Sequence, residues 1–258
     1  MPQLSWLEAE QTPHFPPTDQ SLTYPPGLLA AGGALTPDWL LTAYERGIFP
    51  WYSDGEPILW WSPEPRMVLV PGAMHLSRSL RKAFRQSPPT ITFNTAFPRV
   101  IAACQAPRAR QPGTWISAEM RDAYTELHAL GWAHSIEVWR DDVLIGGLYG
   151  VGIEGVFFGE SMFSHQTNGS KFALLALQEA ALIQSLRVID CQVYNDHLAS
   201  LGAREVDRTW FEQQLPEMRR KQAFPAATVV NQAMAKRMSE DEPGNSRGQS
   251  RREPVDEI

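Results

Sequence analysis

The sequence predicts an α+β protein in which a small N-terminal domain precedes a larger domain of mixed sheet and packed helices. Two observations support this class. Residues 135–193 follow the order strand, strand, strand, loop, helix, strand, which is typical of a sheet covered by a long helix. Residues 1–65 are instead rich in proline, glycine and aromatic residues, so we expect turns and short elements there.

One helix is expected inside the N-terminal domain. Thr36 is a suitable N-cap, Pro37 suits the first helical position, and Gly47 lies just past the expected end. Residues 48–65 combine aromatic side chains with four prolines and predict a packed loop with one short strand. We place a domain boundary near residue 66, which gives an N-terminal domain of residues 1–65.

The larger domain spans residues 66–225 and begins with a strand at 67–70. A helix follows at 76–85, because Leu76, Leu80 and Phe84 recur every four residues. The other expected elements are a helix at 117–130, strands at 135–139, 144–151 and 156–158, a helix from Ser170 to about residue 186, a strand at 188–193 and a short helix at 196–201. The chain from Ser239 onward is polar and charge-rich, and we expect residues 226–258 to form a disordered tail.

Composition excludes several classes of protein. The 258 residues include no apolar run of the ~20 residues that a membrane span needs, and the N-terminus lacks the pattern of a signal peptide. Two cysteines, Cys104 and Cys191, fit a reducing cytoplasm rather than a disulfide framework. The net charge of −6 by itself argues against nucleic acid as a partner.

The distribution of charge points the other way. Residues 65–118 contain no Asp or Glu, while the rest of the chain carries about −14. The basic residues of this stretch are Arg66, Arg78, Arg81, Lys82, Arg85, Arg99, Arg108 and Arg110. Four of them, Arg78, Arg81, Lys82 and Arg85, share one helix face. This face predicts contact with a polyanion, although a solvated helix face is the simpler alternative.

Common cofactor and metal motifs do not occur. The six histidines and two cysteines lack the spacing of zinc ligands, and neither a Walker loop nor a dinucleotide-binding glycine motif is present. Residues 166–171 could hold an anion at the start of a helix, or could be an ordinary N-cap. Trp51 and Trp115, in loops rich in Pro and Gly, could each stack on an unpaired base.

Three polar side chains stand out in apolar surroundings. Asp190 and Gln192 lie on the same face of the last long strand, where they need either hydrogen-bond partners or a catalytic task. Glu160 ends the third strand beside Phe157 and Phe158. It could hold a substrate ammonium in an apolar pocket, or form a buried ion pair with an Arg or Lys.

Several segments together resemble the leucyl/phenylalanyl-tRNA–protein transferase family. They are GIFPWY at 47–52, ILWWSP at 58–63, GTWI at 113–116, HSIEVW at 134–139, GESMFS at 159–164 and IDCQ at 189–192. The resemblance extends from about residue 27 to 214. The joint occurrence of these segments is much more specific for the family than any one segment alone. The chain after about residue 224 lies outside it.

The resemblance implies a bacterial, cytoplasmic aminoacyltransferase whose larger domain has an N-acetyltransferase-like fold. Such an enzyme moves Leu or Phe, and less readily Met, from Leu-tRNA, Phe-tRNA or Met-tRNA to proteins with N-terminal Arg or Lys, marking them for N-end-rule degradation. No metal and no cofactor are implied, because the ester of the tRNA is already activated. We expect a monomer without membrane contact. An acyl-CoA-dependent N-acetyltransferase and a non-catalytic tRNA-binding module remain rival interpretations.

The resemblance also assigns roles to residues. Asp190 would orient Gln192, and the pair would draw a proton from the attacking amine, while Glu160 would hold an ammonium. Trp51 and Trp115 would sandwich the 3′-terminal adenine of the tRNA. From their apolar character we expect an aminoacyl pocket lined by Leu148, Phe157, Met162, Leu177 and Ile189, and phosphate contacts from Arg78, Arg81, Lys82 and Arg85.

Overall fold

Four short strands near the N-terminus form a sheet of order β1-β2-β4-β3 in the computed structural model, which describes residues 4–106 and 116–240. The strands are β1 (Ser5–Leu7), β2 (Leu28–Gly32), β3 (Phe49–Pro50) and β4 (Leu59–Trp61). A 3-10 turn (Thr18–Gln20) and helix α1 (Pro37–Glu45) lie between them. Thr36 is the N-cap of α1, and Gly47, at φ +70°, lets the chain turn away from the helix end. Strands of two to five residues are too short to show alternation in the sequence, so most of this sheet was not expected.

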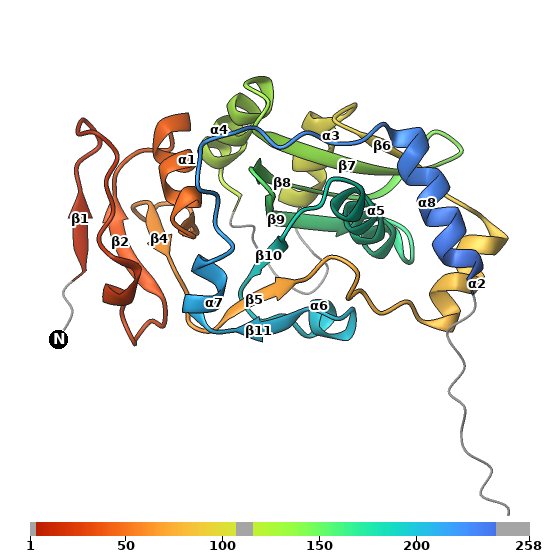
Figure 1. Cartoon of the computed structure of the whole chain (residues 1–258). Helices are drawn as coiled ribbons and strands as arrows, with labels where there is room; N and C mark the ends of the chain where they lie inside the picture. The colour runs from red at the N-terminus through yellow and green to blue at the C-terminus, as the bar shows by residue number, and fades with distance from the viewer. Residues whose placement is uncertain (1–3, 107–115, 241–258) are drawn as a thin grey trace, which may run out of the picture.

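The larger sheet has seven strands in the order β11-β5-β10-β9-β8-β7-β6 (Figure 1). Within the described residues, β9 and β10 are parallel and every other neighbouring pair is antiparallel. The strands are β5 (Arg66–Leu69), β6 (Thr90–Phe93), β7 (Ala133–Arg140), β8 (Val143–Ile153), β9 (Val156–Ser164), β10 (Val188–Gln192) and β11 (Arg204–Val206). The predicted α+β class with a mixed sheet is therefore confirmed. Strand β9 continues beyond the expected end, so Glu160 lies inside it.

Helices cover both faces of this sheet. One face packs against α3 (Phe97–Gln105) and α4 (Ala118–Ala129), and the other against α5 (Gly169–Ile183). Successive side chains of β9 point to opposite faces of the sheet. Phe158 belongs to the core with α3 and α4, whereas Phe157 belongs to the core with α5. Helix α2 (Arg78–Gln86) completes the second layer, and the short helices α6 (Asp196–Ser200) and α7 (Arg208–Glu212) flank β11.

The N-cap of helix α5 lies two residues before the expected one. Asn168, at φ +70°, is the N-cap in place of Ser170. A Cβ atom on Gly146 of β8 would lie 2.4 Å from the carbonyl carbon of Gly169, so the first turn of α5 rests directly on the strand backbone. Ser170 N donates to Ser164 Oγ at 3.3 Å, which favours the N-cap interpretation of this loop over an anion site.

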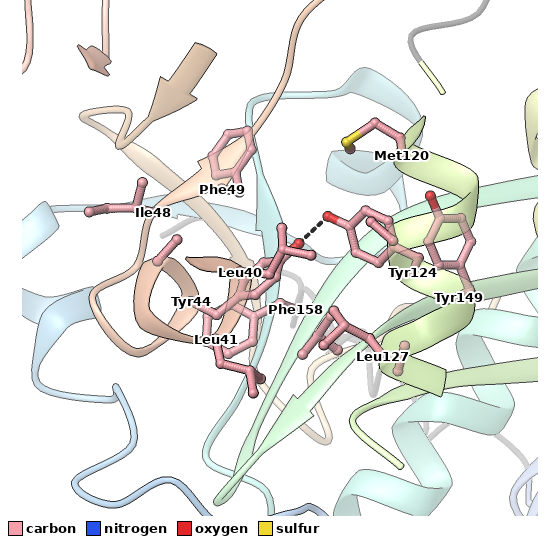
Figure 2. Close-up of a cluster of buried hydrophobic side chains, with 14 of the residues drawn as sticks. Leu40, Leu41, Tyr44, Ile48, Phe49, Met120, Tyr124, Leu127, Tyr149 and Phe158 are labelled. Atoms are coloured by element: carbon pink, nitrogen blue, oxygen red, sulfur yellow. Dashed lines mark hydrogen bonds between the residues drawn. The ribbon is translucent and has the colours of Figure 1, made fainter. Parts of the chain in front are cut away.

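The apolar core on the side of α3 and α4 also joins the two sheets. Leu40 and Tyr44 of α1 lie in one cluster with Tyr124 of α4 and Phe158 of β9 (Figure 2). The rings of Tyr44 and Phe158 are 5.0 Å apart. Side chains of the N-terminal region therefore reach the centre of the larger sheet.

The expectation of a disordered tail is wrong for residues 227–239, which form helix α8 (Ala227–Ser239). Val230, Met234 and Met238 recur every four residues and are fully buried against the layer of α2 and α5. Asn231 adds two hydrogen bonds to strand β6, because it accepts from Ile91 N at 3.1 Å and donates to Ile91 O at 3.0 Å. Residues 241–258 lie outside the described residues.

Candidate active site

Strand β10, at the centre of the larger sheet, contains a bulge. Strands β9 and β10 pair in parallel until Asp190 lies opposite Phe158, and the register of β10 against β5 then shifts at Cys191. Gln192 has a left-handed backbone at φ +64°, which costs a non-glycine residue free energy. Asp190 Oδ1 offsets this cost by accepting a hydrogen bond from Gln192 N at 2.9 Å. The bulge turns Gln192 toward the space that opens between the strands.

Asp190 is also held by a buried arginine. Arg66 donates from Nε to Oδ1 at 2.8 Å and from Nη2 to Oδ2 at 2.7 Å, and both side chains are almost fully buried. The guanidinium lies 4.8 Å from the ring of Phe49 and 4.6 Å from the ring of Phe211. Arg66, one of the eight basic residues of the acid-free stretch, is therefore not available to a polyanion, because its charge is paired with Asp190 in the core.

Glu160 has hydroxyl and amide partners. Tyr44 donates to its Oε1 at 2.7 Å, Tyr124 donates to its Oε2 at 3.0 Å, and Gln192 Nε2 donates to its Oε1 at 2.9 Å. The two tyrosine hydroxyls also contact each other, as the dashed line in Figure 2 shows. Within the described residues Glu160 makes no salt bridge, so the buried ion pair that we considered for it occurs at Asp190.

Burial raises the pKa of Glu160 to about 7. Hydrogen bonds from Tyr44, Tyr124 and Gln192 oppose this rise, whereas the charge of Asp190 adds to it. Burial, and then the Glu160 charge, raise the pKa of both tyrosines well above their usual value. The tyrosines therefore stay protonated donors near neutral pH, while Glu160 changes charge there.

A pocket of about 410 Å³ opens beside these groups. Glu160, Asp190 and Gln192 line it together with all five predicted aminoacyl-pocket residues, Leu148, Phe157, Met162, Leu177 and Ile189. Trp51 also lines it, with 42% of its surface exposed, and its ring lies 5.6 Å from that of Trp61. Trp115 falls outside the described residues. The structure thus brings the predicted carboxylates, amide and apolar residues to one place.

The helix face formed by the four predicted phosphate-binding residues is only partly exposed. Arg78, Lys82 and Arg85 are exposed on α2. Arg81 is half-buried, and its Nη1 donates to the carbonyl oxygens of Arg237 at 2.5 Å and Glu240 at 2.9 Å, where it caps the C-terminus of α8. Arg81 therefore holds the end of α8 and is not an exposed phosphate ligand as predicted. Arg108 and Arg110 lie outside the described residues.

The sequence did not predict Tyr44 and Tyr124 as residues of this site, and it did not predict Arg66 as the partner of Asp190. A signal existed for the tyrosines, because each lies four residues after an apolar residue of a buried helix face, Leu40 and Met120 respectively. A hydroxyl on such a face needs a partner. We find no comparable signal for Arg66, which lies 124 residues before Asp190.

The fold and site define a class of protein. A mixed sheet that opens between two strands onto an apolar pocket, with a buried carboxylate and an amide at the pocket wall, is suited to group transfer to an amine. Two family models match the sequence: leucyl/phenylalanyl-tRNA protein transferase at residues 68–216, and the N-terminal domain of the same transferase at residues 33–64. The chain belongs to the leucyl/phenylalanyl-tRNA–protein transferase family and is an aminoacyltransferase.

Curated relatives agree with this assignment. A leucyl/phenylalanyl-tRNA–protein transferase of Azoarcus sp. is 54% identical over 208 residues, which cover 81% of this chain and 88% of the relative. The enzyme of Aromatoleum aromaticum is 55% identical and covers 81% of this chain and 87% of the relative. The enzyme of Shewanella baltica is 50% identical over 234 residues, 91% of this chain and 98% of the relative.

Among solved structures, similarity is lower. A GCN5-related N-acetyltransferase from Kribbella flavida matches with a TM-score of 0.30 and 14% identity, over 62% of this chain and 57% of the other. The structure of L-PGS from Bacillus licheniformis matches with a TM-score of 0.34 and 11% identity, over 74% of this chain and 66% of the other. None of the helices in residues 4–106 and 116–240 has the length and apolar character to cross a bilayer.

Proposed function

We propose that this chain transfers Leu or Phe, and less readily Met, from aminoacyl-tRNA to the α-amino group of proteins that begin with Arg or Lys. The modified proteins would be marked for N-end-rule degradation in the cytoplasm, and the enzyme would act as a monomer. The observation that carries the proposal is the apolar pocket with Gln192 and Glu160 in its wall. An acyl-CoA donor would not need space for an amino acid side chain next to an ammonium-binding carboxylate.

The reaction joins the amine nitrogen to the ester carbonyl carbon and breaks the bond to the ribose oxygen. The amine loses a proton, and the departing ribose hydroxyl gains one. Because an α-amine has a pKa of about 7.7–8.0, it needs little help to become a nucleophile, and positioning supplies most of the rate. Gln192 Oε1 would accept a hydrogen bond from the attacking amine, while Asp190 holds the backbone of Gln192. The ester is already activated, so no metal or other cofactor is required.

Glu160 and the apolar wall would select the aminoacyl group. The carboxylate suits the ammonium of the amino acid, and Leu148, Phe157, Met162, Leu177 and Ile189 suit an apolar side chain. Trp51, exposed at the same pocket, would stack on the 3′-terminal adenine, and Trp115 is proposed as the second stacking residue.

The apolar wall of the pocket predicts which aminoacyl-tRNAs the enzyme uses. We expect Phe-tRNA and Leu-tRNA to react at least ~10-fold faster than Ile-tRNA, because a branch at Cβ meets the pocket wall next to the reacting carbonyl. The measurement is the initial rate of labelling of an Arg-terminated peptide with each charged tRNA. An acetylated peptide of the same sequence is the control and should stay unlabelled. Equal rates for Phe and Ile would contradict the pocket assignment.

The same assay separates the rival functions. Transfer that needs charged tRNA and proceeds without CoA supports the proposal. Transfer that needs acetyl-CoA would favour an N-acetyltransferase, and tRNA binding without any labelling would favour a binding module.

Exposed residues of α2 should contact tRNA phosphates. We expect Arg78→Glu combined with Lys82→Glu to weaken tRNA binding and to reduce the slope of log affinity against log salt concentration by about 1–2. Arg81 is left unchanged, because it caps α8. The matched control is Arg220→Glu, since Arg220 is exposed and lies outside the acid-free stretch. A double variant that keeps the wild-type salt slope would show that α2 is not a phosphate-binding surface.

A further inference from the structure

The Glu160 carboxylate is the point where the N-terminal region meets the reacting end of the pocket. Tyr44 comes from α1, Tyr124 from α4 and Gln192 from the bulged end of β10, and all three donate to Glu160. Tyr44 and Tyr124 are fully buried and only 8% of Glu160 is exposed, so solvent does not compete for these hydrogen bonds. Through Glu160, the N-terminal region and the larger domain are both connected to the side-chain amide of Gln192.

The chemistry of the partners fixes the direction of each hydrogen bond. An ionised carboxylate only accepts, so Gln192 must present its NH2 group to Glu160. The opposite end of the amide, Oε1, is then left for the pocket that Gln192 lines. If Glu160 carried a proton, it could donate to Oε1 instead, and the amide could turn its NH2 group toward the pocket. An NH2 group cannot accept a hydrogen bond from an amine.

We propose that Tyr44 and Tyr124 are positioning residues, which hold Glu160 as an ionised acceptor and thereby keep Gln192 Oε1 facing the attacking amine. This inference deepens the proposed function, because it rests on the role of Gln192 in aminoacyl transfer. The tyrosines do not touch the substrate in this scheme. They act through Glu160, and Tyr44 makes the reacting site dependent on the N-terminal region.

The environment of Glu160 sets a pH range for this effect. Burial raises the pKa of Glu160 to about 7, and the hydrogen bonds from the two tyrosines lower it relative to a site without them. Among the described residues, the other ionisable groups that interact with it are Asp190 of β10, whose charge is paired with Arg66 of β5, and Tyr149 of β8. Since the ionised form of Glu160 is the productive one, the rate of transfer should rise as pH increases through about 7. Loss of a tyrosine hydroxyl should move that rise to higher pH.

The test compares Tyr44→Phe and Tyr124→Phe with the wild-type chain in single-turnover transfer between pH 6 and pH 9, roughly the range on either side of the Glu160 midpoint. We expect each variant to shift the midpoint upward by about one pH unit, because a hydrogen bond to a charged group is lost. Activity should therefore fall several-fold at neutral pH and recover in alkaline buffer. The matched control is Tyr149→Phe, since the Tyr149 ring packs 5.5 Å from Tyr124 but its hydroxyl makes no hydrogen bond to Glu160. The midpoint of the pH profile of Tyr149→Phe should equal that of the wild-type chain.

A second measurement follows Glu160 without any substrate. The 13C signal of its carboxyl group, assigned by its loss in Glu160→Gln, should titrate near pH 7 in the wild-type chain and about one unit higher in Tyr44→Phe. An unchanged titration in both tyrosine variants would overturn the proposal. A loss of activity by the same factor at every pH would also overturn it, because it would indicate a packing role only. If the titration shifts but no variant or wild-type chain transfers an amino acid, the proposed function fails while the hydrogen-bond network stands.

Discussion

Replacement of Arg66 by Met is expected to lower the free energy of unfolding by about 3–5 kcal/mol. Arg66 donates two hydrogen bonds to Asp190, and neither side chain reaches solvent. Without the guanidinium, the Asp190 carboxylate would remain in the core without a compensating charge. Urea unfolding followed by tryptophan fluorescence measures the loss. Arg78→Met is the control, because Arg78 is exposed on α2 and should change stability by less than about 0.5 kcal/mol.

A double variant tests whether the loss comes from an unpaired charge. Arg66→Met with Asp190→Leu removes both charges and should recover most of the stability, because an apolar pair can replace a buried ion pair at little cost. The double variant should nevertheless remain inactive, since Gln192 N loses its acceptor and the bulge loses its support. A double variant as unstable as the single one would contradict the charge argument. Asp190→Ala alone would mix the two effects and is the weaker experiment.

The larger sheet could be predicted because its signals are local. Strands β7 and β8 alternate or run apolar between clear turns, and Ser117 caps α4 by accepting a hydrogen bond from Met120 N. Helix α8 was missed although Val230, Met234 and Met238 recur every four residues, which is the pattern that predicted the helix at 76–85. It lies outside the family resemblance and directly before the polar end of the chain, and its buried face packs on a surface that α2 and α5 supply.

The candidate site was predictable as a set of residues but not as a network. Asp190, Gln192 and Glu160 could be identified from polar residues in apolar strands and from the family resemblance. Their partners could not, because Arg66 and Tyr44 are far from them in sequence. Arg66 illustrates the difficulty, since it belongs to a stretch of the sequence that contains no acidic residue. Only the structure shows that its acid lies 124 residues further along the chain.

Gln192→Ala is expected to lower the single-turnover rate of transfer by about 10²-fold or more, while the affinity for charged tRNA stays nearly unchanged. The truncation removes the group proposed to accept from the attacking amine, yet it leaves the Arg66–Asp190 pair and the apolar wall intact. Gln192→Glu should fail as well, because a second carboxylate would face Glu160 across the present 2.9 Å hydrogen bond.

The readouts for Gln192 are the transfer rate at saturating Phe-tRNA and the dissociation constant of Phe-tRNA under the same conditions. Tyr194→Phe is a suitable control, because Tyr194 is exposed and its hydroxyl donates to Asp196 at 2.9 Å. Tyr194→Phe should keep the wild-type transfer rate and the wild-type dissociation constant. A Gln192→Ala variant with the wild-type rate would remove Gln192 from the mechanism. A loss of affinity with an unchanged rate at saturation would instead assign Gln192 to binding, because only an interaction made in the transition state lowers the rate at saturation.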